Sequence, residues 1–204
     1  MKNGILVNRA KSFEEAEQFD MKYYLAMTPE ERLNIVQICR EEYHSKIKHE
    51  NRRDFEELLR LFNKNKVRYC IVGAYAVAVY VMSRYTKDID IFIEISEENA
   101  KRIKKALDEF GMKNLNITVD DFLKKGNIIQ LGYEPVRVDI ITDIPGCKFE
   151  QVWKNKKMVN YGRERVYIIG LDDLVISKRS AGRKIDEADL EKLLLLKKRK
   201  KRGI

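Results

Sequence analysis

The spacing of apolar residues predicts two helices ahead of the first strand. Thr28-Pro29-Glu30-Glu31 is a helix start, because Thr28 can cap, Pro29 suits the first helical position and Glu31 can close a capping box. This helix is expected to run to about Tyr43. After a basic stretch, a second apolar stripe at helical spacing comprises Phe55, Leu58, Leu59 and Phe62.

Strands and helices then alternate. Residues 67–72 (VRYCIV) are a buried strand that stops at Gly73, and residues 74–82 are small and apolar as in a buried helix. Residues 88–95 (DIDIFIEI) form the second strand. Ser96 can cap a following helix, for which Gly111 is the C-terminal stop. The order so far is β-α-β-α.

The second half of the chain begins with a hairpin pattern. Residues 127–131 (NIIQL) and 136–142 (VRVDIIT) are strands separated by the turn at 132–135. A further short strand is expected at 166–169. Helices are expected at about 172–181 and 186–200, on either side of Gly182.

These elements suggest three regions in one compact unit, since 204 residues suffice for a substantial core. Residues 1–64 form a helical extension at the N-terminus, residues 65–182 the core, and residues 183–204 a C-terminal helix with a basic tail. The N-terminal helices have two roles open to them, closing over a cleft and forming a homodimer.

Composition favours a cytoplasmic protein. No stretch approaches the roughly 18 continuous apolar residues of a membrane span, and the first residues lack the extended apolar region of a secretory leader. Cys39, Cys70 and Cys147 are an odd number at wide spacing, which fits neither a disulfide framework nor a thiolate metal site. We expect three reduced, packed thiols.

The net charge of +9 comes mostly from the end of the chain. The run from Lys197 to Arg202 supplies six positive charges, which leaves +3 for the rest. Such a run can contact RNA or another polyanion, but it also fits a solvated helix end, where cations suit the negative pole of the helix dipole.

Candidate chemistry begins with two aspartates in the second strand. Because side chains alternate along a strand, Asp88 and Asp90 share one face while Ile89 and Ile91 share the other. Two adjacent carboxylates repel, and repulsion raises one pKa unless a cation neutralises them. Mg²⁺ is the natural partner, since it prefers oxygen ligands and often binds carboxylates together with substrate phosphates.

Asp139 is the third candidate carboxylate. Arg137 and Asp139 share one face of the strand at 136–142, and if that strand lies beside the second one, Asp139 reaches the same ions. Three carboxylates support a two-metal site, in which one ion activates an attacking oxygen and the other steadies a leaving phosphate.

Gly73 is a candidate for holding the phosphates of a nucleoside triphosphate. A glycine between a strand and a helix permits close approach of a phosphate, and the helix start offers backbone amides and a positive dipole end. Arg84 and Lys87, just before the carboxylates, are candidate partners for phosphate oxygens.

These motifs carry a resemblance. The segment YCIVGAYAVAVYVMSRYTKDIDIFI, followed by VRVDII, resembles the DNA polymerase β-type nucleotidyltransferase superfamily, whose pattern is glycine with glycine or serine, then D-x-D, then a distal acidic strand. The closing LDDLVISKRSAGRKIDEADLEKL is similar to the end of its toxin-like and uncharacterised prokaryotic branch. The resemblance covers residues 67–196.

The resemblance implies an α+β nucleotidyltransferase fold, with a mixed sheet and helices packed on one face. It implies transfer of a nucleoside monophosphate from an NTP, with Mg²⁺ bound by Asp88, Asp90 and Asp139, and with Asp139 helping the acceptor hydroxyl attack. Gly73 would carry the phosphate-binding turn.

Further roles follow from the same resemblance. Lys178 matches a lysine that contacts nucleotide phosphates, the alternative being a surface lysine. Asp186 and Asp189 match a closing D-x-x-D, although a helix cap explains Asp186 nearly as well. The chain departs from the pattern at Ala74, where relatives have glycine or serine.

Two functions from different classes follow. The first is a metal-dependent nucleotidyltransferase acting on an RNA, a protein or a small molecule. The role of a toxin in a toxin-antitoxin pair is compatible with this activity and would imply an antitoxin-type protein partner. The second is a catalytically silent module that binds RNA or a partner protein, which Ala74 and the basic tail favour.

Overall fold

The computed structural model describes residues 22, 24–43, 51–81, 86, 88–113, 115–131 and 137–201, and for residues 38–43, 51–54, 185, 200 and 201 it describes the backbone alone. The helices in these ranges include α2 (Pro29–Tyr43), α3 (Asn51–Lys64), α4 (Gly73–Tyr80), α5 (Glu97–Leu107), α6 (Phe149–Asn155), α7 (Leu171–Ala181) and α8 (Lys184–Lys201). The strands are β1 (Tyr69–Ile71), β2 (Asp88–Ile93), β3 (Ile128–Leu131), β4 (Arg137–Ile141), β5 (Lys157–Tyr161) and β6 (Glu164–Ile168). Short helical turns cover Asp108–Met112 and Val119–Phe122.

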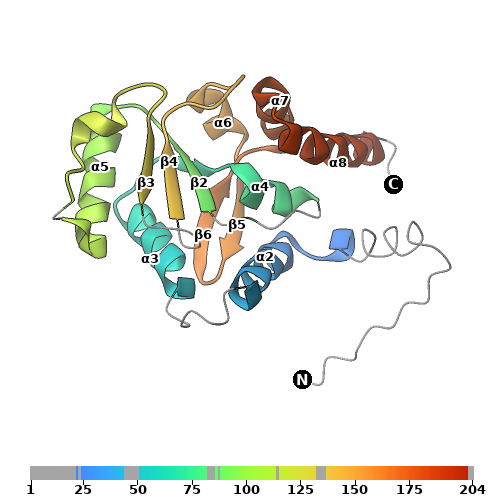
Figure 1. Ribbon diagram of the computed structural model, residues 1–204, viewed down its shortest axis with the longest axis horizontal. Coiled ribbons are helices and arrows are strands. Elements are labelled where there is room, and N and C mark those ends of the chain that lie inside the picture. The colour runs from blue at the N-terminus through green and yellow to red at the C-terminus, as the bar shows by residue number, and fades with distance from the viewer. Residues whose placement is uncertain are drawn as a thin grey trace.

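One mixed sheet contains all of these strands, in the order β3-β4-β2-β1-β6-β5 (Figure 1). The pairs β2–β4 and β1–β6 are parallel, whereas β1–β2, β3–β4 and β5–β6 are antiparallel. The predicted hairpin is therefore β3–β4, and the predicted α+β fold class with its mixed sheet is confirmed.

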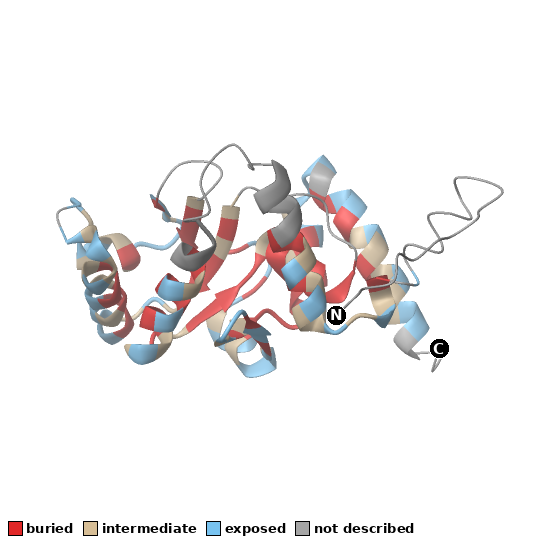
Figure 2. Cartoon of the chain, turned by 90° about the horizontal axis from the view of Figure 1, so that it is seen from below, coloured by how far each residue is buried: buried red, intermediate tan, exposed pale blue. Residues whose placement is uncertain are grey.

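Buried residues concentrate in the strands and on the helix faces that point toward them (Figure 2). In β2 the alternation is as predicted on one side, where Ile89, Ile91 and Ile93 are all buried. The other face carries Asp88, Asp90 and Phe92. The ring of Phe92 packs on Phe149 of α6 at 5.3 Å between centroids, so α6 covers the apolar end of the face that carries the aspartates.

The first strand is shorter than its apolar run. The amide of Val67 donates to the carbonyl of Phe62 at 2.9 Å, and Lys66 has a positive φ of 56°, so these residues finish α3 before β1 begins at Tyr69. The following helix starts one residue earlier than predicted, at Gly73, and it ends at Tyr80 because Val81 is extended.

The N-terminal residues hold the far end of α4. Thr28 and Glu31 form the predicted capping box at the start of α2, with bonds of 2.7 and 3.1 Å. From α2 the guanidinium of Arg32 donates to the carbonyls of Val79 and Tyr80 at 2.6 and 3.3 Å. The same guanidinium bonds the carbonyls of Tyr24 and Leu25 at 3.1 and 2.8 Å, and the hydroxyl of Tyr24 donates to the carbonyl of Ala78 at 3.0 Å. Three consecutive carbonyls at the end of α4 thus accept side-chain donors from the N-terminal region.

Arg32→Met is expected to lower the free energy of unfolding by about 1–3 kcal/mol, because partly buried carbonyls lose a charged donor. Urea unfolding followed by circular dichroism measures the change. Arg60→Met is the control, since Arg60 is 50% exposed and forms one ion pair, with Glu57. Equal losses in the two variants would contradict the role given to Arg32.

Two further expectations concern thiols and membranes. Cys70 and Cys147 are free and buried, as predicted, and burial raises the pKa of each thiol, to about 12 and about 11. The side chain of Cys39 lies outside the described residues. In the described part of the chain, no helix combines the length and the apolar character needed to cross a membrane.

Candidate active site

The three predicted carboxylates lie on neighbouring strands. In the parallel pairing of β2 with β4, Asp90 is the register partner of Asp139 and Asp88 is that of Arg137. Register partners in adjacent strands point to the same face of a sheet. The prediction that Asp139 joins Asp88 and Asp90 is therefore confirmed.

A cavity of about 630 Å³ opens over these residues. Gly73 and Ala74 from the first turn of α4 border it, and so do Lys178 of α7 and Asp186 of α8. Asp88, Asp90 and Asp139 are also among its lining residues. The volume lies in the range of ligand-binding clefts. Segments more than a hundred residues apart thus meet around one space.

Gly73 touches the carboxylate of Asp90. Its φ is +62°, and a Cβ built there would lie 1.8 Å from Oδ2 of Asp90. The amide of Val72 donates to the carbonyl of Asp90 at 2.9 Å, which fixes the two segments against each other. Any side chain at position 73 would collide with the carboxylate, so the turn needs glycine for contact as well as for conformation.

Arg137 bridges two of the carboxylates. Its guanidinium donates to both oxygens of Asp139, at 2.8 and 3.1 Å, and also to Oδ2 of Asp88. The hydroxyl of Thr86 donates to the other oxygen of Asp88 at 2.9 Å. Arg137 is thus the cation that compensates this pair of charges.

The surroundings of Asp90 shift its pKa. Burial raises the pKa of Asp90 to about 6, the negative charges of Asp88 and Asp139 add to that rise, and the positive charges of Lys178 and Arg183 oppose it. Perturbed carboxyl groups of this kind concentrate at functional sites.

Asp90→Asn is expected to stabilise the protein in the absence of ligands. A carboxyl whose pKa is raised from 3.8 to about 6 on folding destabilises the folded state increasingly as pH rises through that interval, and fully above it. The variant should therefore gain about 1–3 kcal/mol at pH 8 and almost nothing below pH ~3.8. Thermal unfolding at both pH values measures this.

The control for that experiment is Asp143→Asn, in the same cavity but with a side chain that is 39% exposed. A gain at Asp143 as large as that at Asp90, or a gain at Asp90 that does not depend on pH, would contradict the electrostatic explanation.

Lys178 is buried in a network of charges rather than exposed. Its ammonium donates to Asp186 at 2.7 Å and to Asp189 at 2.8 Å, and the three side chains are at most 6% exposed. Arg183 adds a bond to Asp186 at 2.6 Å. Burial alone would raise the pKa of Asp186, but the hydrogen bonds from Arg183 and Lys178 outweigh it and hold that pKa below its usual value.

This network corrects the alternative interpretation of Asp186 as a helix cap. Helix α8 begins at Lys184, so Asp186 lies inside its first turn and binds Lys178 instead of capping. The ion pairs join α7 to α8 at the wall of the cavity.

Asp88, Asp90 and Asp139 suit Mg²⁺, because they offer carboxylate oxygens and lie on two adjacent strands. Among the described side chains, however, no three from Asp, Glu, His or Cys converge as a metal-ligand set. The carboxylates of Asp88 and Asp139 are instead paired with the guanidinium of Arg137. Metal binding at these carboxylates therefore requires Arg137 to move away from them.

The sequence identified the aspartates of the two strands, the glycine turn and Lys178 as residues of the site, but it missed other residues of the cavity. Arg84 and Lys87 lie outside the described residues. The sequence motifs did not identify Arg183 as a residue of the cavity, nor Thr86 as a hydrogen-bond donor to Asp88. The three-residue spacing from Arg183 to Asp186 at a helix start was the available signal for the first.

Comparison with known proteins identifies the family. The profile of the family described as "Nucleotidyltransferase of unknown function (DUF6036)" matches residues 52–200. The chain belongs to this family. The predicted relation to nucleotidyltransferases is thereby confirmed, whereas the toxin-like branch stays a prediction.

Other comparisons add little to this nucleotidyltransferase family. No curated protein matches the chain. A solved structure from Thermotoga maritima, described as a "putative nucleotidyltransferase", is similar at 20% sequence identity with a TM-score of 0.48. The similarity covers 70% of this chain and 91% of that one.

Proposed function

We propose that the protein is a Mg²⁺-dependent nucleotidyltransferase, which transfers a nucleoside monophosphate from an NTP to an RNA, protein or small-molecule acceptor. The observation that carries the proposal is the meeting of Asp88, Asp90 and Asp139 in one cavity with the Gly73 turn packed directly on Asp90.

In this proposal Asp88, Asp90 and Asp139 hold the metal ions. When bound there, Mg²⁺ would supply neutralisation of phosphate charge and activation of an attacking oxygen. Asp90, with its raised pKa, and Asp139 stand side by side where an acceptor hydroxyl would enter.

The triphosphate has its own proposed contacts. The first turn of α4, at Gly73 and Ala74, receives phosphate oxygens through backbone amides. Ala74 is 4% exposed and small, so it leaves room for that approach without supplying a hydroxyl. Arg84 and Lys87 are proposed as further phosphate partners.

Two cations from the α7–α8 side of the cavity are also part of the proposal. Lys178 acts on the site through its charge, which opposes the rise in the pKa of Asp90. It contacts phosphate if one of its ion-pair partners exchanges. Arg183 is exposed and borders the cavity, which makes it the cation most accessible to a triphosphate tail.

The test is label transfer. The protein is incubated with NTPs labelled at the α-phosphate, with Mg²⁺ and with cell extract. We expect labelled product that EDTA abolishes and that Asp139→Asn lowers by about 10²- to 10³-fold, the effect of removing one group that stabilises the transition state. Asp143→Asn is the matched control, because this partly exposed carboxylate lies in the same cavity but is not one of the proposed metal ligands, and the variant should keep activity.

If no label is transferred, the catalytically silent binding module is the alternative function. Calorimetry then distinguishes the enzyme from the module. Mg²⁺-dependent NTP binding that Asp88→Asn removes supports the enzyme. RNA binding that depends on residues 197–202, without NTP affinity, supports the module. Growth arrest on expression, relieved by Asp90→Ala, would support the role of a toxin.

A further inference from the structure

A second cavity, of about 640 Å³, lies at the opposite end of α4 from the catalytic one. The first turn of α4 borders the catalytic cavity, and its last residues, Val79 and Tyr80, border the second. Helix α8 also borders both cavities, with Asp186 at the catalytic one and Leu196 and Arg199 at the second. The two cavities share no lining residue among those described.

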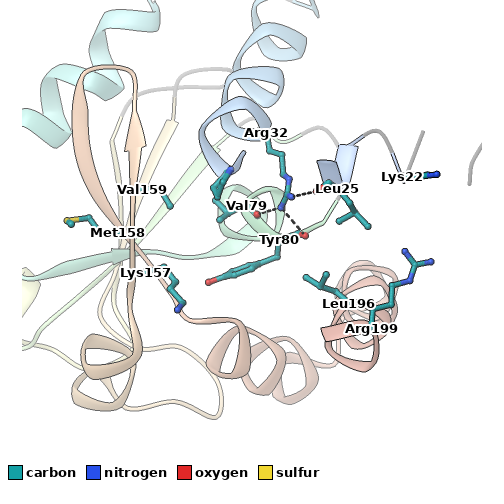
Figure 3. A pocket seen from close by; sticks show the side chains of 11 residues that line it. Lys22, Leu25, Arg32, Val79, Tyr80, Lys157, Met158, Val159, Leu196 and Arg199 are labelled. Atoms are coloured by element: carbon teal, nitrogen blue, oxygen red, sulfur yellow. Dashed lines mark hydrogen bonds between the residues drawn. The ribbon is translucent and has the colours of Figure 1, made fainter. Parts of the chain in front are cut away.

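The inner wall of this cavity is apolar. Side chains from four segments contribute to it, with Leu25, Tyr80 and Leu196 drawn around the space in Figure 3. The hydroxyl of Tyr80 donates to the carbonyl of Ile169 at 2.8 Å. The polar atom of Tyr80 is therefore satisfied elsewhere, and the cavity is offered mainly its ring.

Every charged residue in the described lining is a cation. Lys22, Lys157 and Arg199 are exposed, whereas Arg32 is half-buried, and none of the described lining residues is an Asp or Glu. Figure 3 shows Lys157 and Arg199 coming from different elements, β5 and α8. Arg32 is held by backbone carbonyls, which solvate its charge without cancelling it.

The catalytic cavity differs in charge, since its described lining combines five aspartates with the three cations Arg137, Lys178 and Arg183. At the second cavity an anion meets cations and no carboxylate among the described lining residues, and is therefore attracted. An apolar wall stabilises a ligand that also has an apolar body, since burial of apolar surface is favourable.

We propose that this cavity is a second ligand site, for an organic anion that combines an apolar body with a phosphate or carboxylate head. The body, a hydrocarbon chain or an aromatic ring, lies against Leu25, Tyr80 and Leu196. Lys157 and Arg199 flank these apolar side chains, and the head lies against one of the two cations. Such a ligand comes from either of two sources, acyl-chain compounds or nucleotides.

Calorimetry on the full chain, without Mg²⁺, tests the site with decyl phosphate and with AMP. We expect one ligand per chain for at least one of them, with an affinity that falls as NaCl is raised. Binding of decyl phosphate alone assigns the site to acyl-chain anions, and binding of AMP alone assigns it to nucleotides. Decyltrimethylammonium, which has the same chain and the opposite charge, should bind at least about tenfold more weakly than decyl phosphate.

Two double variants with equal changes of net charge locate the site. Lys157→Glu with Arg199→Glu should weaken binding by about tenfold or more, because two attractive charges become repulsive. Lys101→Glu with Lys105→Glu, on exposed positions of α5, should leave it unchanged. Circular dichroism confirms that both fold, and Leu196→Asp provides a second disruption of the cavity.

Three results would overturn the proposal. They are no binding of either phosphate, equal weakening by the two double variants, and binding of decyltrimethylammonium as tight as that of decyl phosphate. None of them depends on nucleotidyl transfer, so this test and the label-transfer test fail independently.

Discussion

Gly73→Ala is expected to lower label transfer by about a hundredfold or more, on the scale of losing one preorganised group of an active site. The added Cβ would stand 1.8 Å from Oδ2 of Asp90, so either the turn or the carboxylate must leave its position. Both are proposed to meet the NTP, one at the phosphates and one at the metal ions. Affinity for Mg²⁺–NTP, measured by calorimetry, should fall together with transfer.

Gly182→Ala separates this contact from backbone strain. Gly182 has nearly the same φ, +61°, but a Cβ there meets nothing within 4 Å. Each substitution places alanine in the left-handed region at a cost of about 1–2 kcal/mol, and only Gly73→Ala adds a collision. If both variants lost NTP affinity equally, the contact with Asp90 would not be what makes glycine necessary.

Lys178→Met is expected to destabilise the protein by about 3–5 kcal/mol, because it leaves buried Asp186 and Asp189 without their shared ammonium. In the variant, Arg183 still forms its ion pair with Asp186. Within this network of described residues, Asp189 has no second cation to replace Lys178. Chemical denaturation at pH 7 measures the loss. Lys101→Met, at a side chain that is 64% exposed, is the matched control and should change stability little.

Two further measurements identify the cause of that loss. Asp186→Asn and Asp189→Asn, added to Lys178→Met, should recover part of it, because the unpaired charges disappear. The wild-type ion pairs keep the pKa of Asp186 low, so their stabilisation is present above pH ~3.8 and fades as pH falls further. The gap between wild type and Lys178→Met should therefore narrow in acid. A gap that is constant with pH would indicate lost packing instead.

Alternation along the strands was enough to predict the core of the site. The D-x-D pattern placed Asp88 and Asp90 on one face, and the same rule placed Asp139 beside Arg137. What could not be predicted was the register between β2 and β4. That register sets Arg137 opposite Asp88, and so turns a neighbour of Asp139 into a bridge between two carboxylates.

Two elements carried too weak a signal for prediction. Helix α6 has seven residues, too few to repeat a helical stripe, and it is stabilised by ring contacts such as Phe149 with Phe92. Strand β5 is an edge strand with Met158 56% exposed, so its side chains do not alternate cleanly between apolar and polar. Tertiary contacts, rather than local pattern, determine both.

The bonds from Tyr24 and Arg32 to α4 bear on how much of the chain an active fragment needs. A fragment limited to residues 52–200, the part that defines the family, would keep Gly73, Asp88, Asp90 and Asp139. The carbonyls of residues 78–80, at the end of α4, would lose their side-chain donors and bind water instead. The beginning of the same helix forms the turn at Gly73. Truncation at the family boundary should thus yield a protein that retains every proposed catalytic carboxylate but has a frayed end of helix α4.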